Sequence, residues 1–369
     1  MRLYNIMTLA WILVIVGYLS GCSIIQSLQN MDLGTNAKPE VQEKPKSSCP
    51  KKYCPNTRDK LVRLLKNQNI SLSDIDTSKI TDMSFLFANF NDENGKNLCD
   101  KIPTFSKKQQ EKCEHSASYR KDFSGIEFWD TSKVTNMSYM FYNQPAFNQN
   151  IQLWNVSRVS NMDSAFAKAQ SFNQPLESWN VANVKNMDSL FAYAQSFNQP
   201  LDKWNVSKVE NMASLFSGAK SFNQPLASWN VSRVTNMAYM FSYAQAFNQP
   251  LNNWNVSKVE KMYNMFSYAH NFNQPLDKWN VGRVTDMASM FFEAKSFNQP
   301  LASWNVANVK DMSFIFTHAH SFNQDIQSWK IVKVQNMSWM FEYSPLRYNP
   351  PKWYAPWKKR KVAKEVESR

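Results

Sequence analysis

The chain has 369 residues, 43% of them hydrophobic and 14% aromatic, and a formal net charge of +13 at pH 7. Disordered low-complexity chains lack aromatic and large aliphatic residues, so this composition excludes that class. The chain has only seven glycines and no Gly-rich phosphate loop, nucleophile elbow or zincin helix, so nothing in it indicates an enzyme, a cofactor or a catalytic residue.

The first residues read as an export signal. Arg2 supplies a positive charge, and the apolar stretch 6–18 is too short to span a membrane comfortably. It leads into LSGC, residues 19–22, which resembles a bacterial lipobox. The resemblance implies that 1–21 is a signal peptide and that Cys22 carries a lipid anchor, which places the chain in the cell envelope, at the outer membrane or cell surface if the cell is Gram-negative; the envelope type stays open. An ordinary signal peptide with an unrelated cysteine is the alternative.

The segment after the signal divides into a tether and a cap. Residues 22–59 are polar and contain Pro, Lys and Ser, which predicts a flexible, lipid-anchored linker. The sequence DKLVRLLKNQNISL follows and places Leu61, Leu64 and Leu65 at helical spacing. An open end of a repeat stack exposes its core, so we expect residues 60–122 to form an N-terminal cap that includes a diverged first repeat and a cysteine-containing insertion.

The remaining cysteines are candidates for disulfides, because an even number in an exported protein favours pairing. They are Cys49, Cys54, Cys99 and Cys113. Three pairings are possible, and sequence proximity favours Cys49–Cys54 and Cys99–Cys113. The second pair lies in the insertion, since Ile75 and Trp129 are 54 residues apart instead of 25. Zinc binding by the four thiols is the rival interpretation, although no CxxC motif or histidine at ligand spacing supports it.

Tryptophan marks an internal repeat of 25 residues between 123 and 343. Met stands eight positions after each Trp and Phe stands twelve positions after it. An earlier, diverged copy has Ile75 in the Trp place, with Met83 and Phe87 at the same offsets. A fixed period of this length is typical of stacked repeats, which bury together what one unit cannot bury alone. The nine Trp positions are Trp129, Trp154, Trp179, Trp204, Trp229, Trp254, Trp279, Trp304 and Trp329.

Each repeat contains two apolar patterns. Leu-x-x-Trp-x-Val, as in 201–206, has the spacing of the leucine-rich-repeat strand. Val-x-x-Met-x-x-Met/Leu-Phe-x-x-Ala has helical spacing, and Ser207 stands where it would cap such a helix. A Phe-Asn-Gln-Pro turn follows. The sequence therefore predicts an α/β solenoid, a right-handed leucine-rich-repeat-like stack of about ten coils with short parallel strands and short helices, whose Trp, Phe and Met residues form the core.

The order of these residues, F-N-Q-x-L/I-x-x-W-x-V-S-x-V-x-N-M-x-x-M-F-x-x-A, resembles the repeats of the BspA-like leucine-rich-repeat surface protein family. The resemblance extends from about Phe123 to Phe341, with the diverged copy at 75–87. It implies a surface lipoprotein or adhesin, and for some members of that family binding to host matrix proteins is suggested. The resemblance brings no catalytic residues with it.

Basic residues recur four positions after Trp in seven of the nine repeats. Like charges on neighbouring coils repel each other, so the repetition needs a reason. One explanation is duplication of a solvated side chain, and the other is a cationic track for an acidic glycan or an acidic protein. The seven candidates for ligand binding are Lys133, Arg158, Lys208, Arg233, Lys258, Arg283 and Lys333.

The C-terminal segment, 344–369, is expected to cap the last coil with its aromatic residues and to continue as a basic tail. His318 and His320 are two residues apart, but the pattern supplies no acidic partner, so we expect no metal site. Export, and the lack of exposed aromatic residues among the basic ones, disfavour nucleic acid as a partner. Two functions remain open: a lipid-anchored adhesion or binding module for a protein or acidic glycan, and a structural envelope lipoprotein that binds no host molecule. The oligomeric state stays open.

Overall fold

The computed structural model describes residues 49–355, which lie within one compact unit, Ser48–Arg369. In these residues two α-helices precede the repeats, α1 (Arg58–Leu65) and α2 (Lys107–Glu114). The predicted signal peptide, Cys22, most of the linker and the basic tail lie outside the described residues. The short 3₁₀ helices are η1 (Leu72–Asp74), η2 (Cys99–Lys101), η3 (Ile126–Phe128), η4 (Pro345–Arg347) and η5 (Lys352–Tyr354).

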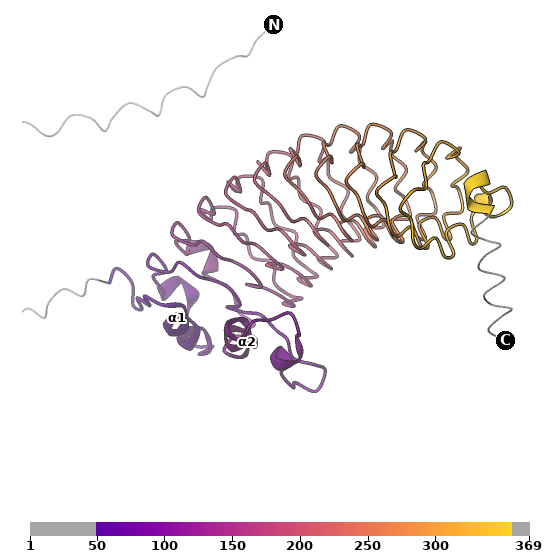
Figure 1. Cartoon of the computed structure of the whole chain (residues 1–369). Coiled ribbons are helices and arrows are strands. Elements are labelled where there is room, and N and C mark those ends of the chain that lie inside the picture. The colour runs from indigo at the N-terminus through magenta and orange to yellow at the C-terminus, as the bar shows by residue number, and fades with distance from the viewer. Residues whose placement is uncertain (1–48, 356–369) are drawn as a thin grey trace, which may run out of the picture. The chain divides into compact units, whose positions relative to one another are not determined.

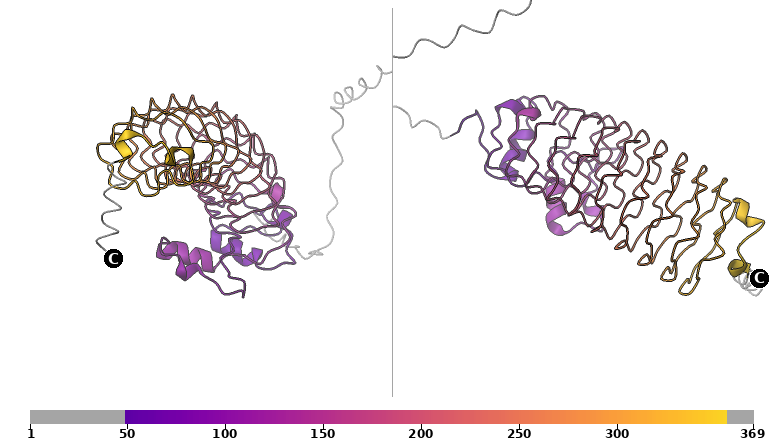
Figure 2. Two further views of the ribbon diagram at one scale, coloured as in Figure 1. Left: turned by 90° about the vertical axis from the view of Figure 1, so that its right-hand side faces the viewer. Right: turned by 90° about the horizontal axis from the view of Figure 1, so that it is seen from above.

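The repeats form a stack of irregular coils, and the predicted α/β solenoid is wrong. Between residues 49 and 355 there is no β-strand and no sheet, and neither α-helix lies in a regular repeat. The β-type pairing between neighbouring coils is limited to isolated parallel bridges, such as those of Asn211 with Asn236 and of Asn236 with Lys261. The coils nevertheless lie side by side in register (Figure 1 and Figure 2), with each residue beside its equivalent 25 positions away.

Consecutive turns explain why the expected helix is absent. The N–H of Leu215 donates to the carbonyl of Met212, and that of Ala219 donates to the carbonyl of Phe216, and each bond closes a four-residue β-turn. Ser214 and Gly218 take left-handed φ values of 53° and 69° at the third position of these turns, as in a type II turn. Turns closed every three or four residues produce the same apolar spacing as a helix, so the pattern alone could not distinguish them.

The alternate N–H groups of the same segment join one coil to the next. Met212 donates to Asn236 at 3.0 Å, Ser214 to Ala238 at 2.8 Å and Gly218 to Ser242 at 2.7 Å. Each N–H therefore closes either a turn or a bond to the following coil, which satisfies the backbone without a sheet.

The expected strand is absent because a turn also closes Leu-x-x-Trp. The N–H of Trp204 donates to the carbonyl of Leu201 at 3.0 Å. Within residues 49–355, no backbone-to-backbone hydrogen bond joins the segment 201–206 to a neighbouring coil. The indole fills this role, because Trp204 Nε1 donates to the carbonyl of Leu176 in the preceding coil at 2.9 Å. The predicted N-cap at Ser207 is also wrong, since Asn205 Oδ1 accepts from the Ser207 N–H in a local turn.

The core consists of columns of side chains from successive coils. Trp204 and Trp229 stack with their ring centroids 6.5 Å apart and their planes 1° apart. Phe216 lies 3.9 Å from Phe222 within its own coil and 5.7 Å from Phe241 in the next. These rings, together with the repeated Met, Leu and Val residues, are buried, and burial of each such side chain contributes about 1.5–3 kcal/mol.

A second column of polar side chains follows the turn after each repeat. Asn223 Oδ1 accepts from the N–H of Asn248 in the next coil at 2.9 Å and from Gln249 Nε2 at 3.1 Å. The same pair of bonds recurs from coil to coil; for example, Asn173 Oδ1 accepts from the Asn198 N–H and from Gln199 Nε2. The Phe-Asn-Gln-Pro motif therefore provides a hydrogen-bond ladder as well as a turn.

Helix α1 covers the first coil. Thr57 caps the helix by accepting from the Lys60 N–H, and Leu61 and Leu65 are buried in the core. Two buried arginines fix the surrounding loops. Arg58 donates to the carbonyls of Ser84, Phe85 and Lys112, and Arg120 donates to those of Leu65, Asn67, Ile70 and Asp122.

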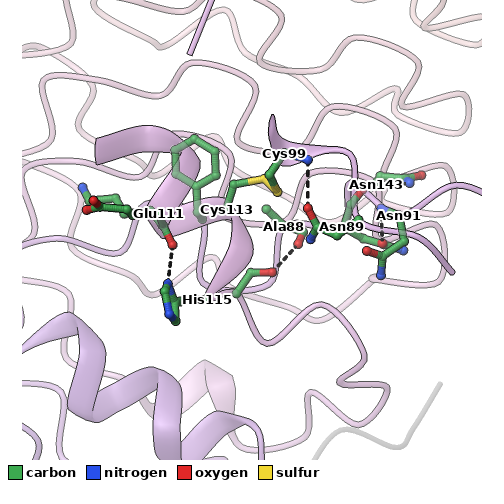
Figure 3. Close-up of a disulfide and its surroundings, with 12 residues drawn as sticks. Ala88, Asn89, Asn91, Cys99, Glu111, Cys113, His115 and Asn143 are labelled. Atoms are coloured by element: carbon green, nitrogen blue, oxygen red, sulfur yellow. Dashed lines mark hydrogen bonds between the residues drawn. A yellow bond between two sulfur atoms is a disulfide. The ribbon is translucent and has the colours of Figure 1, made fainter. Parts of the chain in front are cut away.

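The insertion is held by one of two disulfides. Cys99 and Cys113 are bonded, with their Cα atoms 5.8 Å apart, and this bond ties helix α2 to the loop before it (Figure 3). Phe85, Phe90 and Phe105 surround the disulfide in a small separate core. Cys49 and Cys54 form the other bond. All four sulfurs are thus occupied, which contradicts the zinc interpretation.

The C-terminal end of the stack is covered by aromatic residues. Trp353 stacks on Trp329 with centroids 6.2 Å apart, and its Nε1 donates to the Ile326 carbonyl at 3.1 Å. It thereby continues the Trp column beyond the last full repeat. Among residues 49–355, no helix has both the length and the apolar content needed to cross a bilayer.

Candidate binding surfaces of the repeat stack

The structure brings the seven basic candidates into one line, called here the basic column. Each occupies the position four residues after Trp, and all seven are exposed. Asn183 and Asn308 fill this position in the two other coils. Lys208 Nζ donates to Asn183 Oδ1 at 2.7 Å, and Lys333 Nζ donates to Asn308 Oδ1 at 2.8 Å. Column residues of adjacent coils therefore touch.

No residue of the basic column forms a salt bridge within the described chain. Salt bridges occur elsewhere, for example between Lys203 and Glu177 at 2.8 Å and between Arg347 and Glu342 at 3.0 Å. None of the salt bridges among residues 49–355 includes one of the seven. Apart from the nearby charge of Asp130, which interacts with Lys133, their mutual repulsion is reduced by water and salt, which leaves the positive charge available to a ligand.

A different surface is hollowed by an open cavity of about 370 Å³, called here the tyrosine groove. It crosses several consecutive coils, and its lining combines aromatic rings with small neutral polar side chains. The aromatic lining comprises Tyr193, Tyr239, Tyr243, Tyr268, Phe292 and Phe314. The polar lining comprises Ser217, Ser242, Asn264, Ser267 and Ser289.

Backbone conformation directs the groove side chains away from the core. Most of the aromatic ones stand ten or fourteen positions after Trp, where the turn residue is left-handed. Tyr239 and Tyr243 both have φ of 58° and both are 40% exposed. Their neighbours at positions eleven and twelve, Met240 and Phe241, are fully buried. The turns therefore divide each coil into inward and outward side chains.

The pKa of one tyrosine of the groove is shifted. Burial, followed by the adjacent Tyr268 hydroxyl, raises the pKa of Tyr243 above its usual value. No Asp, Glu, Lys or Arg lines the cavity. Its hydroxyl and amide groups both donate and accept hydrogen bonds, so the surface can take up a polar, uncharged ligand.

The sequence interpretation missed this groove because it assigned the repeated aromatic stripes to the core. A signal was present in the repeats themselves. The position twelve after Trp is Phe in every regular copy, whereas the position ten after Trp holds Ser214, Tyr239, Asn264, Ser289 and Phe314 in successive copies. A packing position must repeat, so an aromatic residue at a varying position is a candidate for the surface.

Two carboxyls lie on adjacent coils at the position nine after Trp. Ser164 Oγ donates to Asp163 Oδ1 at 2.8 Å, and Ser189 Oγ donates to Asp188 Oδ1 at 2.8 Å. Burial, together with the charge of Asp188, raises the pKa of Asp163 to about 7. Burial also raises the pKa of Asp188. Burial thus favours the protonated form of both carboxyls.

The histidine pair does not form a metal centre with its neighbours. The ring of His318 stacks on Tyr343 with centroids 4.4 Å apart, and its Nδ1 lies 3.7 Å from Glu293 Oε1. The described part of the chain contains no group of three or more His, Cys, Asp or Glu side chains arranged to hold a metal ion.

Comparison with known proteins gives one family. The model of the family described as "Mycoplasma protein of unknown function, DUF285" matches residues 111–216, 200–291 and 271–364, more than half of the chain. No curated protein and no solved structure matches.

Proposed function

The chain belongs to the family described as "Mycoplasma protein of unknown function, DUF285", and we propose that it is a lipid-anchored surface protein whose basic column binds acidic glycans or acidic proteins. Three matches in tandem are consistent with a repeat surface protein. The resemblance to BspA-like adhesins and the lipobox at Cys22 support surface display, and the basic column supports binding.

One observation carries the binding part of the proposal. Seven exposed cations lie in line over the stack without an ion-pair partner among the described residues. If the seven cations were merely solvated copies of one duplicated residue, nothing would disfavour acidic side chains that pair with them. A repeated positive charge at a fixed spacing suits a polymer with repeated negative charge.

Binding of the purified full-length chain to immobilised heparin, measured from 50 to 500 mM salt, tests this proposal. Replacing Arg158, Lys208, Arg233 and Lys258 with Glu is expected to weaken binding at least about tenfold and to flatten its salt dependence. A control variant carries the same charge change on the exposed lysines of the cap: Lys96, Lys107, Lys108 and Lys121.

Equal binding by the two variants would show that only net charge matters and would overturn the role of the column. Display is tested separately by protease treatment of intact cells. Cleavage of the repeat region supports a surface protein, and full protection supports an internal envelope lipoprotein.

A further inference from the structure

We propose that the tyrosine groove is a second binding site, which takes a neutral glycan whose sugar rings stack on the ring of Tyr193. The proposal goes beyond the basic column, because it concerns other residues and an uncharged ligand.

The first observation is Gly218, the single glycine among the outward-facing residues that stand fourteen positions after each Trp. Its neighbours in that column, including Tyr193, Tyr243 and Tyr268, are left-handed with φ of 58–59° although they carry side chains. A left-handed φ therefore does not itself require Gly218. What distinguishes this position is contact, because a Cβ on Gly218 would lie 2.6 Å from Cδ1 and 2.9 Å from Cε1 of Tyr193.

The missing side chain at Gly218 makes room for the Tyr193 ring. One side of the ring rests over the glycine backbone, and 46% of Tyr193 remains exposed to solvent. The result is an aromatic platform at one end of the groove. Tyr243 and Tyr268 differ from it, since they stack on each other with centroids 4.2 Å apart and offer mainly their edges and hydroxyls.

The second observation is the chemistry of the remaining lining. Ser242, Ser267 and Asn264 offer neutral donors and acceptors beside the rings. A pyranose has an apolar C–H face for an aromatic ring and hydroxyls for such groups. The lack of charged lining side chains disfavours an acidic glycan or a charged peptide, whose charges would lose water without gaining a partner.

The third observation concerns the backbone under the groove. The backbone N–H of Tyr239 donates to the carbonyl of Tyr263 at 3.0 Å, and that of Tyr243 donates to the carbonyl of Ser267 at 2.8 Å. The N–H of Ser242 donates to the carbonyl of Tyr239 and closes a turn. These N–H groups are already used, so a peptide cannot bind here by adding a strand. Recognition falls to the side chains of the lining, of which Ser217, Ser242 and Ser267 recur at the same position in three successive coils, which suits a ligand built from repeated units.

The test is affinity electrophoresis of the full-length chain through native gels that contain neutral dextran, galactan or mannan at 150 mM salt. We expect retardation by at least one polysaccharide. Tyr193→Ala removes the platform and should weaken binding about tenfold. Gly218→Ala should weaken it as well, since the new Cβ displaces the Tyr193 ring. Tyr348→Ala is the matched control, because this tyrosine is 87% exposed and lies outside the groove.

Thermal unfolding of each variant identifies loss of binding that is caused only by misfolding. No retardation in any of the gels, or equal retardation of wild type and a folded Tyr193→Ala variant, would overturn the proposal. Capture of a protein that depends on Tyr193 without any glycan binding would also overturn it. The heparin experiment fails or succeeds independently, because the charge-reversed column variant keeps the groove intact.

Discussion

At the residue scale, one polar atom of each repeated Trp and Asn side chain joins neighbouring coils: the indole Nε1 of Trp and the amide Oδ1 of Asn. Each regular Trp buries its ring and donates from its indole to the preceding coil, as Trp254 does to the Leu226 carbonyl at 2.9 Å. Asn223 accepts two bonds from the following coil. Asp163 is different, because burial disfavours its charged form.

Asp163 makes stability depend on pH. Its folded-state pKa of about 7 lies above the ordinary value of a carboxyl, so its contribution to stability is complete below about pH 4 and is lost as the pH rises through 7. Asp163→Asn should therefore stabilise the protein at pH 8, by about 1–2 kcal/mol after allowance for solvent screening, and change little at pH 4.

Denaturant unfolding at pH 4, 6 and 8 measures this difference. Asp325→Asn, at an exposed turn residue, serves as the control. A stability difference between wild type and Asp163→Asn that stays constant from pH 4 to pH 8 would contradict the assignment.

At the scale of the element, the unit of this fold is a 25-residue coil that contacts only its neighbours. Its bonds to its neighbours recur with the 25-residue period, as in the Asn223 N–H that donates to Asn198 Oδ1 and the Asn248 N–H that donates to Asn223 Oδ1. Removal of one entire coil therefore preserves every type of contact, whereas removal of part of a coil breaks every column at the junction.

Deletion of residues 148–172 joins Phe147 to Asn173 and restores the Phe-Asn-Gln-Pro motif. We expect a folded, cooperative protein whose melting temperature falls by no more than about 5 °C. Deletion of 148–159 removes half a coil, breaks the columns at this junction, and should lower the melting temperature clearly more than the whole-coil deletion does. Circular dichroism melting curves compare the two, and similar curves for both would show that register does not matter.

The coil also shows what the sequence could and could not reveal. The period and the buried Trp, Met and Phe columns were predictable, because dense packing demands the same side chain in each copy. The local conformation was not, since turns ending at Trp204 and Leu215 reproduce the spacing of a strand motif and a helix. The left-handed φ of Tyr239 and Tyr243 is equally hidden, because propensity disfavours it for such residues. The groove depends on these conformations and so was missed.

At the scale of the whole molecule, the described unit is a one-dimensional array with two different caps. Helix α1 and the buried arginines cover the first coil. The last coil relies on Trp353 and its stacking partner Trp329. In such an array, loss of an end cap should open the end locally and leave the middle unchanged.

Trp353→Ala is expected to accelerate backbone hydrogen exchange in the last repeat, around residues 326–343, by about tenfold or more, because a buried ring face and one indole hydrogen bond are lost. Exchange in the central coils should not change. Tyr348→Ala removes an exposed aromatic side chain from the same region and provides the comparison. Uniform acceleration along the chain would instead indicate a single cooperative unit.

The direction of the bonds between coils has an electrical consequence. In the coil that begins at Trp204, the N–H groups of Met212, Ser214, Phe216 and Gly218 donate to the following coil, while those of Glu210, Ser221 and Asn223 and the Trp204 indole donate to the preceding one. Peptide dipoles that point both ways along the axis largely cancel, so the stack does not build up the macrodipole of a helix. An anion approaching along the axis therefore distinguishes the two ends by their caps and not by a summed dipole.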